Sequence, residues 1–525
     1  MAQFEIKNGV AIIPDGTKKI KEYAFSNCTS LETLAIPNSV TCIEEFAFKG
    51  CTSLKSITIP ELVTEIGWEA FKDCTSLESI VIANGNPVYD SREGCNAIIE
   101  TTTNTLIKGC KTTVIPNSVT KIQFDTFKGC TSLEKVIIPE GVTEIGGHAF
   151  EGCTSLESII IPESVKNIVI YAFRDCTSLK SIIIPESVTK IGSCVFEGCT
   201  SLESIVVADG NPVYDSREGC NAIIETTTNT LIQGCKTTVI PESVTEIGNS
   251  AFLGCISLES VTIPEGVTEI GQCTFRSCTS LKSITIPESV TKIGWKSFIG
   301  CTSLEKVIIP EGVTEIGERA FGRCASLESV TIPNSVTKIE VCTFEGCTSL
   351  ESIVLPKVRK IERYAFDGCT SLKSITIPKS VKKIDEGAFR GCTSLESVTI
   401  PKGVKKINRC TFYGCTSLKS ITIPESVTEI EDHAFVECTS LESITIPNSL
   451  TEIGDWAFYG CTSLESITIP ESVTKIGIGA VDGCTSLVTI NVPAKKSHYY
   501  KWYLRPNVHD KIVELAPEKK TKEKK

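Results

Sequence analysis

Cysteine and histidine are the residues of this chain most able to do chemistry, as nucleophiles, redox centres or metal ligands. The sequence holds 27 cysteines and four histidines among its 525 residues. His148, His433, His498 and His509 are scattered, and no two of them have the spacing of a zinc motif. No Cys-x-x-Cys pair and no glycine-rich phosphate loop occurs in the sequence. We therefore expect no metal site, no cofactor and no catalytic residue, so the chain is not predicted to be an enzyme.

The cysteines instead recur with a regular spacing. The motif Cys-Thr-Ser-Leu first appears at Cys28, last appears at Cys484 and usually repeats every 23 residues, in 18 copies with near matches included. A strict period of this length is typical of a solenoid, in which each turn buries its apolar face on its neighbours. Equivalent thiols then stack into a ladder with no natural pairing scheme, and free cysteine behaves as a small buried hydrophobe. We expect a ladder of buried thiols; disulfides or metal ligation are the alternatives.

Seven cysteines lie off this ladder, and four of them share one variable position of the turn that we expect to be exposed. Exposed free thiols favour a reducing compartment. The first residues also lack a secretory signal, so these two features favour the cytoplasm. The four are Cys194, Cys273, Cys342 and Cys410, and the other three are Cys42, Cys95 and Cys220.

One turn, starting at Cys278, shows which elements must position these residues. Ser283 to Ile286 alternates polar and β-branched residues, which predicts a short strand with Ile284 and Ile286 pointing inward. Pro287 ends the strand because it cannot donate a ladder hydrogen bond. A second short extended piece follows at residues 290–293, and a brief helical turn then carries Phe298 into the core. Of the 20 phenylalanines, 17 hold this last position.

The repeated turn resembles the leucine-rich repeats of the BspA-like, or Treponema pallidum-type, family. The segments that carry the resemblance are Leu441-Glu-Ser-Ile-Thr-Ile-Pro447 and Ala457-Phe-Tyr-Gly-Cys461, and similar turns cover roughly residues 10–493. The resemblance implies a leucine-rich-repeat solenoid, a right-handed superhelix of about 23-residue turns. It also implies a parallel β-sheet on one face, with short strands and helical turns on the others. Members of the family are associated with adhesion to surfaces.

Departures from the repeat predict the organisation of the chain. A 125-residue offset duplicates an irregular element, with insertions at residues 83–110 and 208–235 inside a solenoid of residues 28–493. Each insertion should form a protruding loop and a hairpin, residues 97–100 against 105–107 in the first copy. Tyr89 and Tyr214 are expected to anchor these loops; a small polar site made by Tyr89, Asp90 and Arg92 is the alternative.

The ends of the chain should cap the solenoid, because exposed terminal turns need polar cover. Residues 1–27 are predicted to form an N-terminal capping turn. Residues 494–515 should form a C-terminal cap with a short helix and a final strand, and residues 516–525 a disordered lysine-rich tail.

The charge balance restricts the class of partner. The chain has 52 basic and 63 acidic residues, a net charge of −11, which argues against a general nucleic-acid binder. No apolar run approaches the roughly 18 residues of a membrane span. A protein is therefore the expected partner, and the oligomeric state stays open.

The first candidate surface for a protein partner is a column of residues that should point outward from the strands. It is aliphatic in the N-terminal half and mostly threonine in the C-terminal half, where it includes Thr285, Thr376 and Thr399. Exposed aliphatic side chains on successive turns are typical of a binding patch. The alternative is plain β-propensity on a packed sheet. The aliphatic members are Val81, Ile137, Ile160, Ile183 and Val206.

The second candidate surface is a block of cations on three successive turns. Like charges about 5 Å apart repel one another, so an acidic partner would offset a cost. The alternative is chance accumulation of lysine on a tolerant surface. The block comprises Lys357, Arg359 and Lys360; Lys379, Lys382 and Lys383; Lys402, Lys405 and Lys406; and Arg409.

Two functions agree with these patterns. The family resemblance implies an adhesin-like protein of the cell surface or secreted fraction that binds a macromolecule through its repeat surface. The absent signal and the cysteines favour an intracellular scaffold, effector or assembly component that binds another protein. Export of the chain would separate the two.

Overall fold

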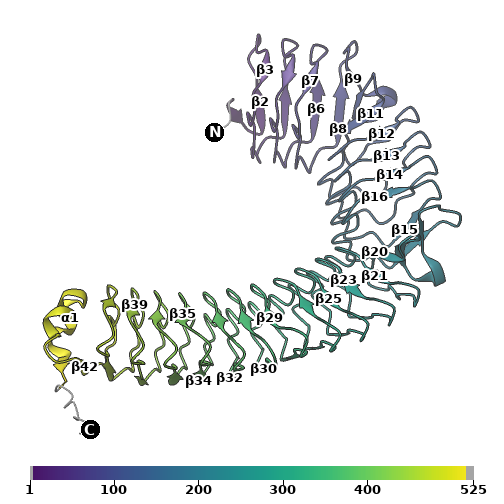
Figure 1. Ribbon diagram of the computed structural model, residues 1–525. Coiled ribbons are helices and arrows are strands. Elements are labelled where there is room, and N and C mark those ends of the chain that lie inside the picture. Colours follow the sequence, from purple (N-terminus) through teal and green to yellow (C-terminus); the bar gives the residue numbers. More distant parts are fainter. Residues whose placement is uncertain (1–3, 516–525) are drawn as a thin grey trace, which may run out of the picture. The chain divides into compact units, whose positions relative to one another are not determined.

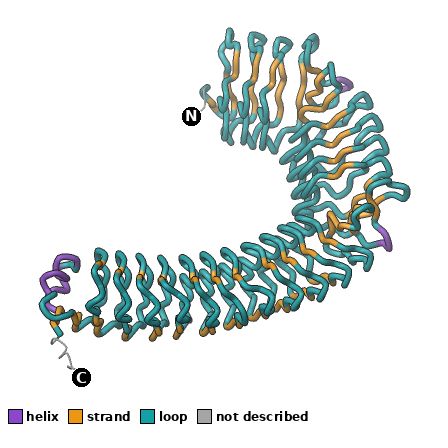
Figure 2. Tube along the Cα trace, viewed as in Figure 1, coloured by secondary structure: helices purple, strands orange, loops and turns teal. Residues whose placement is uncertain are grey.

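The computed structural model describes residues 4–515, so the predicted lysine-rich tail at 516–525 lies outside the described residues. The chain forms two compact units, residues 1–258 and 259–525, and each is described by itself. Both are stacks of short turns, with strands of successive turns side by side (Figure 1). Loops and turns make up most of each repeat, and the strands are short (Figure 2). The predicted leucine-rich-repeat solenoid is confirmed.

Most regular turns contribute two short strands that pair in parallel with strands of neighbouring turns, and the turns that start at Cys130 and Cys153 have isolated bridges in place of the first strand. In the second unit, β24 (Ser283–Thr285) pairs with β26 (Lys306–Ile308), and β25 (Lys292–Ile293) pairs with β27 (Glu315–Ile316). Alternate residues of the first strand point to opposite faces, so Ile284 is buried while Thr285 is exposed. Ile286, just after the strand, is buried as well, which confirms the predicted inward pair.

The first unit begins with the antiparallel pair β1 (Ile6–Lys7) and β2 (Val10–Ile12). Its further first strands are β4 (Thr33–Ala35), β6 (Ser56–Ile59), β8 (Ser79–Ile82), β15 (Ser181–Ile184) and β17 (Ser204–Val207). Its second strands are β3 (Lys19–Ile20), β5 (Cys42–Ile43), β7 (Glu65–Ile66), β12 (Lys121–Ile122), β13 (Glu144–Ile145), β14 (Asn167–Ile168), β16 (Lys190–Ile191) and β21 (Glu246–Ile247).

The second unit continues the same alternation. Its first strands are β22 (Ser260–Thr262), β24, β26, β28 (Ser329–Thr331), β30 (Ser352–Val354), β32 (Ser374–Thr376), β34 (Ser397–Thr399), β36 (Ser420–Thr422), β38 (Ser443–Ile444), β40 (Ser466–Thr468) and β42 (Thr489–Val492). Its second strands are β23 (Glu269–Ile270), β25, β27, β29 (Lys338–Ile339), β31 (Lys360–Ile361), β33 (Lys383–Ile384), β35 (Lys406–Ile407), β37 (Glu429–Ile430), β39 (Glu452–Ile453) and β41 (Lys475–Ile476).

The two insertions fold alike, and the predicted hairpin is present in both. The first contains β9 (Tyr89–Asp90), the 3₁₀ turn Arg92–Gly94, β10 (Ile98–Glu100) and β11 (Thr105–Lys108), with β10 antiparallel to both β9 and β11. The second contains β18 (Tyr214–Asp215), the 3₁₀ turn Arg217–Gly219, β19 (Ala222–Glu225) and β20 (Thr230–Gly234), with the same antiparallel pairing.

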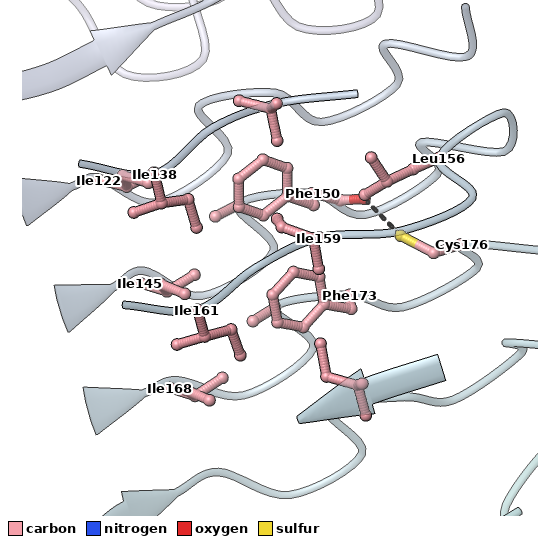
Figure 3. Close-up of a cluster of buried hydrophobic side chains, with 14 of the residues drawn as sticks. Ile122, Ile138, Ile145, Phe150, Leu156, Ile159, Ile161, Ile168, Phe173 and Cys176 are labelled. Carbon is pink, nitrogen blue, oxygen red and sulfur yellow. Dashed lines mark hydrogen bonds between the residues drawn. The ribbon is translucent and has the colours of Figure 1, made fainter. Parts of the chain in front are cut away.

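Ladders of identical side chains form the core. Phe150 and Phe173, one turn apart, stack with ring centroids 5.4 Å apart, and isoleucine ladders line the same interior (Figure 3). The Cys176 Sγ lies 3.2 Å from the carbonyl oxygen of Phe150, and most other ladder thiols donate in the same way to a backbone carbonyl of the preceding turn. The predicted ladder of buried thiols is confirmed, and burial raises the pKa of the Cys301 thiol to about 12.

The segment around each phenylalanine is a chain of hydrogen-bonded turns and not the helical turn expected from the sequence. The Cys176 amide donates to the Phe173 carbonyl at 3.2 Å, three residues back. Two residues of such a segment have positive φ, for example Tyr171 at 59° and Asp175 at 57°. Left-handed residues interrupt an α-helix, and glycine meets this requirement most easily, which explains the frequent Gly-Cys pair.

The expectation that four off-ladder cysteines are exposed is wrong. Cys194, Cys273 and Cys342 are buried, and Cys410 is half-buried. All four occupy the first left-handed position of their turn, with φ between 54° and 56°. That backbone conformation places their side chains beside the neighbouring turns, so these thiols give no argument for a reducing compartment.

At its C-terminal end the second unit carries α1 (Ser497–Tyr503), a 3₁₀ segment (Pro506–Lys511) and β43 (Ile512–Glu514). β43 pairs in parallel with β42, and Tyr500 of α1 is fully buried. These elements cover the apolar end of the last turn. Among residues 4–515, no helix is long and apolar enough to cross a membrane.

Candidate binding surfaces

The aliphatic column of the first unit is strongly exposed. Ile137, Ile160 and Ile183 are 83%, 80% and 61% exposed, and Val81 and Val206 are 43% and 41% exposed. Strand alternation puts them outward while their sequence neighbours fill the core. Ile183 and Val206 are direct partners in the parallel ladder, and a bridge joins Ile137 to Ile160. Four successive turns therefore present one aliphatic side chain each to solvent.

The structure adds two members to this column that were missed in the sequence. Val114 and Val239, in the irregular turns, are each 73% exposed. Each lies two residues before a proline, as Ile137 does. Aligning the irregular turns on that proline would have found both. A groove of about 430 Å³ runs beside the column and is lined by Ile137 and Ile160 among others.

The cation block of the second unit separates into a neutralised column and a free one. Lys360, Lys383 and Lys406 pair with acidic side chains: Lys360 with Glu362 at 2.6 Å, Lys383 with Asp385 at 2.6 Å and Lys406 with Glu429 at 2.5 Å. The structure thus supplies internal counter-charges for three of the ten cations of the predicted block.

The other cations of the block face solvent. Lys357, Arg359, Lys379, Lys382, Lys402, Lys405 and Arg409 are exposed, and none has an ion pair through its side chain among the described residues. A groove of about 1040 Å³ is lined by Lys379, Lys382 and Lys402 together with the hydroxyl groups of Thr376 and Thr399. Ammonium and hydroxyl donors lining one groove suit an anionic group.

The polar residues of the inserted loops are used inside the loops. The Tyr89 hydroxyl accepts a hydrogen bond from the Ile66 amide at 3.3 Å, and the ring is buried. Arg92 Nε donates to both Asp90 oxygens at 2.9 and 3.0 Å, and its Nη1 donates to Asn104 at 2.9 Å. These contacts favour the anchoring role of Tyr89 over the alternative of a polar site.

A further column was not identified from the sequence: one aromatic ring on each of six turns in the first unit. The rings are contiguous, with centroid distances of 5.2 Å for Tyr23–Phe46, 5.2 Å for Phe46–Trp68 and 6.5 Å for Trp68–Phe124. His148 and Tyr171 continue the row beyond Phe124 at 4.8 and 4.9 Å. The signal was available in the sequence, because these residues lie two or three places before the core phenylalanine of their turns.

Within the described part of the chain, the histidines and carboxylates are not grouped as metal ligands would be. No group of three or more metal-ligating side chains occurs within residues 4–515. His148 contacts the Glu151 carboxylate through its Nδ1. His433 instead packs on the Trp456 ring, with centroids 5.2 Å apart.

Several bacterial leucine-rich repeat proteins of known structure are similar to this chain. A leucine-rich cell surface protein from Faecalibacterium prausnitzii is 32% identical, over 66% of this chain and 87% of that chain, with a TM-score of 0.47. A leucine-rich repeat protein from Bacteroides ovatus is 27% identical over 91% and 88% of the two chains, with a TM-score of 0.35. The Treponema pallidum leucine-rich repeat protein is 32% identical over 37% and 82%, with a TM-score of 0.27. No curated protein matches the chain.

The family profile described as the BspA type leucine rich repeat region matches in six copies. The matched residues are 6–105, 103–216, 229–351, 314–415, 340–461 and 382–504. These matches span most of the chain, and the protein belongs to the BspA-type leucine-rich repeat family.

Proposed function

We propose that this protein is a non-enzymatic binding protein whose partner protein docks on the aliphatic column of the first unit. The observation that carries the proposal is the 83%, 80% and 61% exposure of Ile137, Ile160 and Ile183 on successive turns. Soluble proteins rarely keep such side chains together in water without a binding role. Burying one of them stabilises a complex by about 1.5–3 kcal/mol.

The chain itself supplies the variant that tests this proposal. Threonine occupies the same outward position in the second unit, for example at Thr285 of β24, where the same strand geometry persists. The triple variant Ile137→Thr, Ile160→Thr and Ile183→Thr should therefore keep its fold, because threonine is also β-branched.

The measurement is quantitative capture by the intact chain from surface and intracellular protein fractions, compared between wild type and variant. We expect the specifically captured protein to fall at least tenfold in the variant. Thr285→Ser serves as the control. This substitution changes the same outward position in the second unit, where the wild-type side chain is already polar. Equal capture by wild type and triple variant would contradict the proposal.

The exposed cations give a second candidate surface, for an acidic protein segment. Lys379, Lys382 and Lys402 converge on one groove without ion-pair partners in the part of the chain described. Reversal of these three charges to glutamate should weaken binding of an acidic partner and reduce its dependence on salt. Reversal of Lys360, Lys383 and Lys406 is the matched control; those residues already pair with this chain's own carboxylates.

Adhesin-like recognition outside the cell is the form of this function that the family suggests. An intracellular scaffold is the second form. Fractionation of the source cell, with detection of the intact chain, separates them: recovery from the surface or medium supports the adhesin, and retention in the cytosol supports the scaffold.

A further inference from the structure

The first unit contains a pocket of about 230 Å³ at the place where its regular stacking is interrupted. In the regular turns each phenylalanine segment donates hydrogen bonds to the next one; the Phe48 amide, for instance, donates to the Ala70 carbonyl at 2.8 Å. The first insertion follows the segment that contains Ala70. The Gly109 amide of this insertion donates a hydrogen bond to the Thr126 carbonyl at 3.0 Å. No backbone hydrogen bond joins residues 67–73 to residues 123–129 within the described chain. The pocket lies between these two segments.

Two aromatic side chains flank the opening. Trp68 is 53% exposed and Phe124 is 39% exposed, and both line the pocket. Their centroids are 6.5 Å apart, wider than the 4.8–5.2 Å found along the rest of the row. Trp68 is turned 82° from Phe46 and is not stacked on it. Aromatic surface next to the pocket is therefore accessible to a ligand.

Polar groups inside the pocket lack hydrogen bonds. Gln123 Oε1 is buried without a hydrogen-bond donor among residues 4–515, and the buried Asp125 carboxylate is held only by Lys128, whose Nζ lies 3.4 Å from its Oδ1, and by its neighbour Glu69. Lys108 is only 8% exposed, lines the same pocket and has no hydrogen bond or ion pair through its ammonium group in the described chain. A buried polar group without a partner costs about 1–3 kcal/mol. A ligand that both accepts and donates hydrogen bonds would remove part of that cost.

Four of the five charged groups that line the pocket are already paired with one another, which favours a neutral ligand. Glu69 pairs with Lys72 at 2.6 Å, and Lys128 Nζ lies 3.4 Å from Asp125 Oδ1. A charged ligand would need to disrupt these pairs. A hydroxyl group can donate to the Asp125 carboxylate and the Gln123 carbonyl and can accept from an ammonium group without doing so.

We propose that this pocket binds a single pyranose ring of a neutral glycan. A pyranose has an apolar C–H face for aromatic walls and hydroxyl groups for convergent acceptors and donors, the combination that defines small-ligand sites. The volume is below the roughly 300 Å³ at which pockets for drug-sized molecules begin, so one ring fits better than an oligosaccharide. This site lies on side chains distinct from the aliphatic column and does not depend on the protein-binding proposal.

The second insertion supplies a natural contrast. Its loop repeats the first almost unchanged, but most residues that line the first pocket differ in the second copy, whereas Ile66, Gly67 and Phe71 are kept as Ile191, Gly192 and Phe196. Ser193 stands where the first copy has Trp68, and Asn249 stands where it has Phe124. Cys194, Glu197 and Gln233 stand where the first copy has Glu69, Lys72 and Lys108. Gly248, Ser250 and Leu253 stand where it has Gln123, Asp125 and Lys128. The fold thus tolerates loss of the pocket's aromatic walls.

The test uses the intact chain and the methyl glycosides of glucose, galactose, mannose and N-acetylglucosamine, with saturation-transfer NMR and a titration of each. We expect at least one glycoside to bind with a Kd on the order of 1 mM, which is about −4 kcal/mol. Methyl glucuronide should bind at least fivefold more weakly than methyl glucoside. Glycerol, a polyol without a ring, should not bind.

The decisive variant carries Trp68→Ser and Phe124→Asn, the residues of the second copy. It should fold, as shown by an unchanged circular dichroism spectrum, and lose at least tenfold in affinity. Trp295→Ala is the matched control, because Trp295 is a comparably exposed tryptophan of the second unit, at 40%. Failure of all four glycosides at 20-fold the expected Kd (about 20 mM), equal binding of glycerol, or full affinity in the Trp68→Ser, Phe124→Asn variant would overturn the proposal.

Discussion

The two inserted loops of the first unit have the same internal construction and different surroundings. In one, Asn86 Nδ2 donates to the carbonyls of Pro60 and Val63 at 3.0 and 2.8 Å; in the other, Asn211 Nδ2 donates to Pro185 and Val188 at 2.9 and 2.9 Å. The acceptors in these hydrogen bonds are backbone carbonyl groups, which every turn provides. The loop can therefore be held in the same way at two places along a stack, whatever side chains surround it.

The flanking turns show the opposite behaviour. Trp68, Phe124 and Asp125 of the first copy correspond to Ser193, Asn249 and Ser250 of the second. These positions belong to the variable segment ahead of each core phenylalanine, where a side chain does not contribute to the ladders. The comparison indicates that the loop has a structural role, and that the side chains able to bind a ligand lie on the turns beside it.

The largest effect that tests this comparison is removal of the loop anchors. Asn86→Ala deletes two donated bonds and two accepted from the amides of Val88 and Tyr89. Asn211→Ala deletes the equivalent four. At about 1 kcal/mol per bond, each variant should lose about 2–4 kcal/mol of local stability. Hydrogen exchange of residues 83–110 and 208–235 measures it, since a solenoid opens locally.

The two losses should agree within about 0.5 kcal/mol, the usual scatter for independent sites. A loss of local stability in only one of the two loops would show that the loops are not equivalent structural units, and would contradict the comparison.

The next effect belongs to the first copy alone and depends on pH. Burial beside Glu69 raises the pKa of Asp125 to about 7, with Lys128 opposing the shift. The native state then keeps a proton that the unfolded state releases near pH 4, so local stability falls as pH rises from about 4 to 7. Asp125→Asn removes this loss and should stabilise the segment at pH 8 by on the order of 2 kcal/mol.

At pH 4 the variant and the wild type should be nearly equal, since Asp125 is then protonated in the native state and about half protonated in the unfolded state. The pKa of Glu69 is lowered by Asp125 and Lys72, so its own contribution is complete by about pH 5. Hydrogen exchange of residues 123–129 at both pH values gives the measurement. Residues 248–254, where Ser250 replaces the acid, are the internal control; a gain at pH 8 of less than about 0.5 kcal/mol would contradict the argument.

Sequence alone predicted the ladders and the hairpins because both depend on local, repeated patterns. The inward Ile284 and Ile286 follow from strand alternation, and the pairing of β10 with β11 follows from two short apolar runs around a turn. The cysteine ladder follows from one residue type at one position of a repeat.

The same reasoning was wrong about the position shared by Cys194, Cys273, Cys342 and Cys410. Variability in sequence was interpreted as exposure, but the left-handed backbone there turns the side chain toward a neighbouring turn. The pocket beside Trp68 could not be predicted either. It depends on how far two turns separate when 56 residues, Cys74 to Cys130, replace two turns of 23.

The smallest effect concerns the arginine that pins each loop to its hairpin. Arg92 pairs with Asp90 at 2.6 Å and Arg217 with Asp215 at 2.7 Å, with both arginine side chains 26% exposed. Solvent screens these pairs, so Arg92→Ala and Arg217→Ala should each cost about 1 kcal/mol in hairpin protection. Arg92→Lys should recover little of it, because lysine cannot reproduce the two-pronged contact. Equal losses of hairpin protection in the two variants would show that both arginines have a structural role. A glycoside affinity that falls with Arg92→Ala while hairpin protection is unchanged would instead place Arg92 at the ligand, and the division between loop and flanking turns would have to be redrawn.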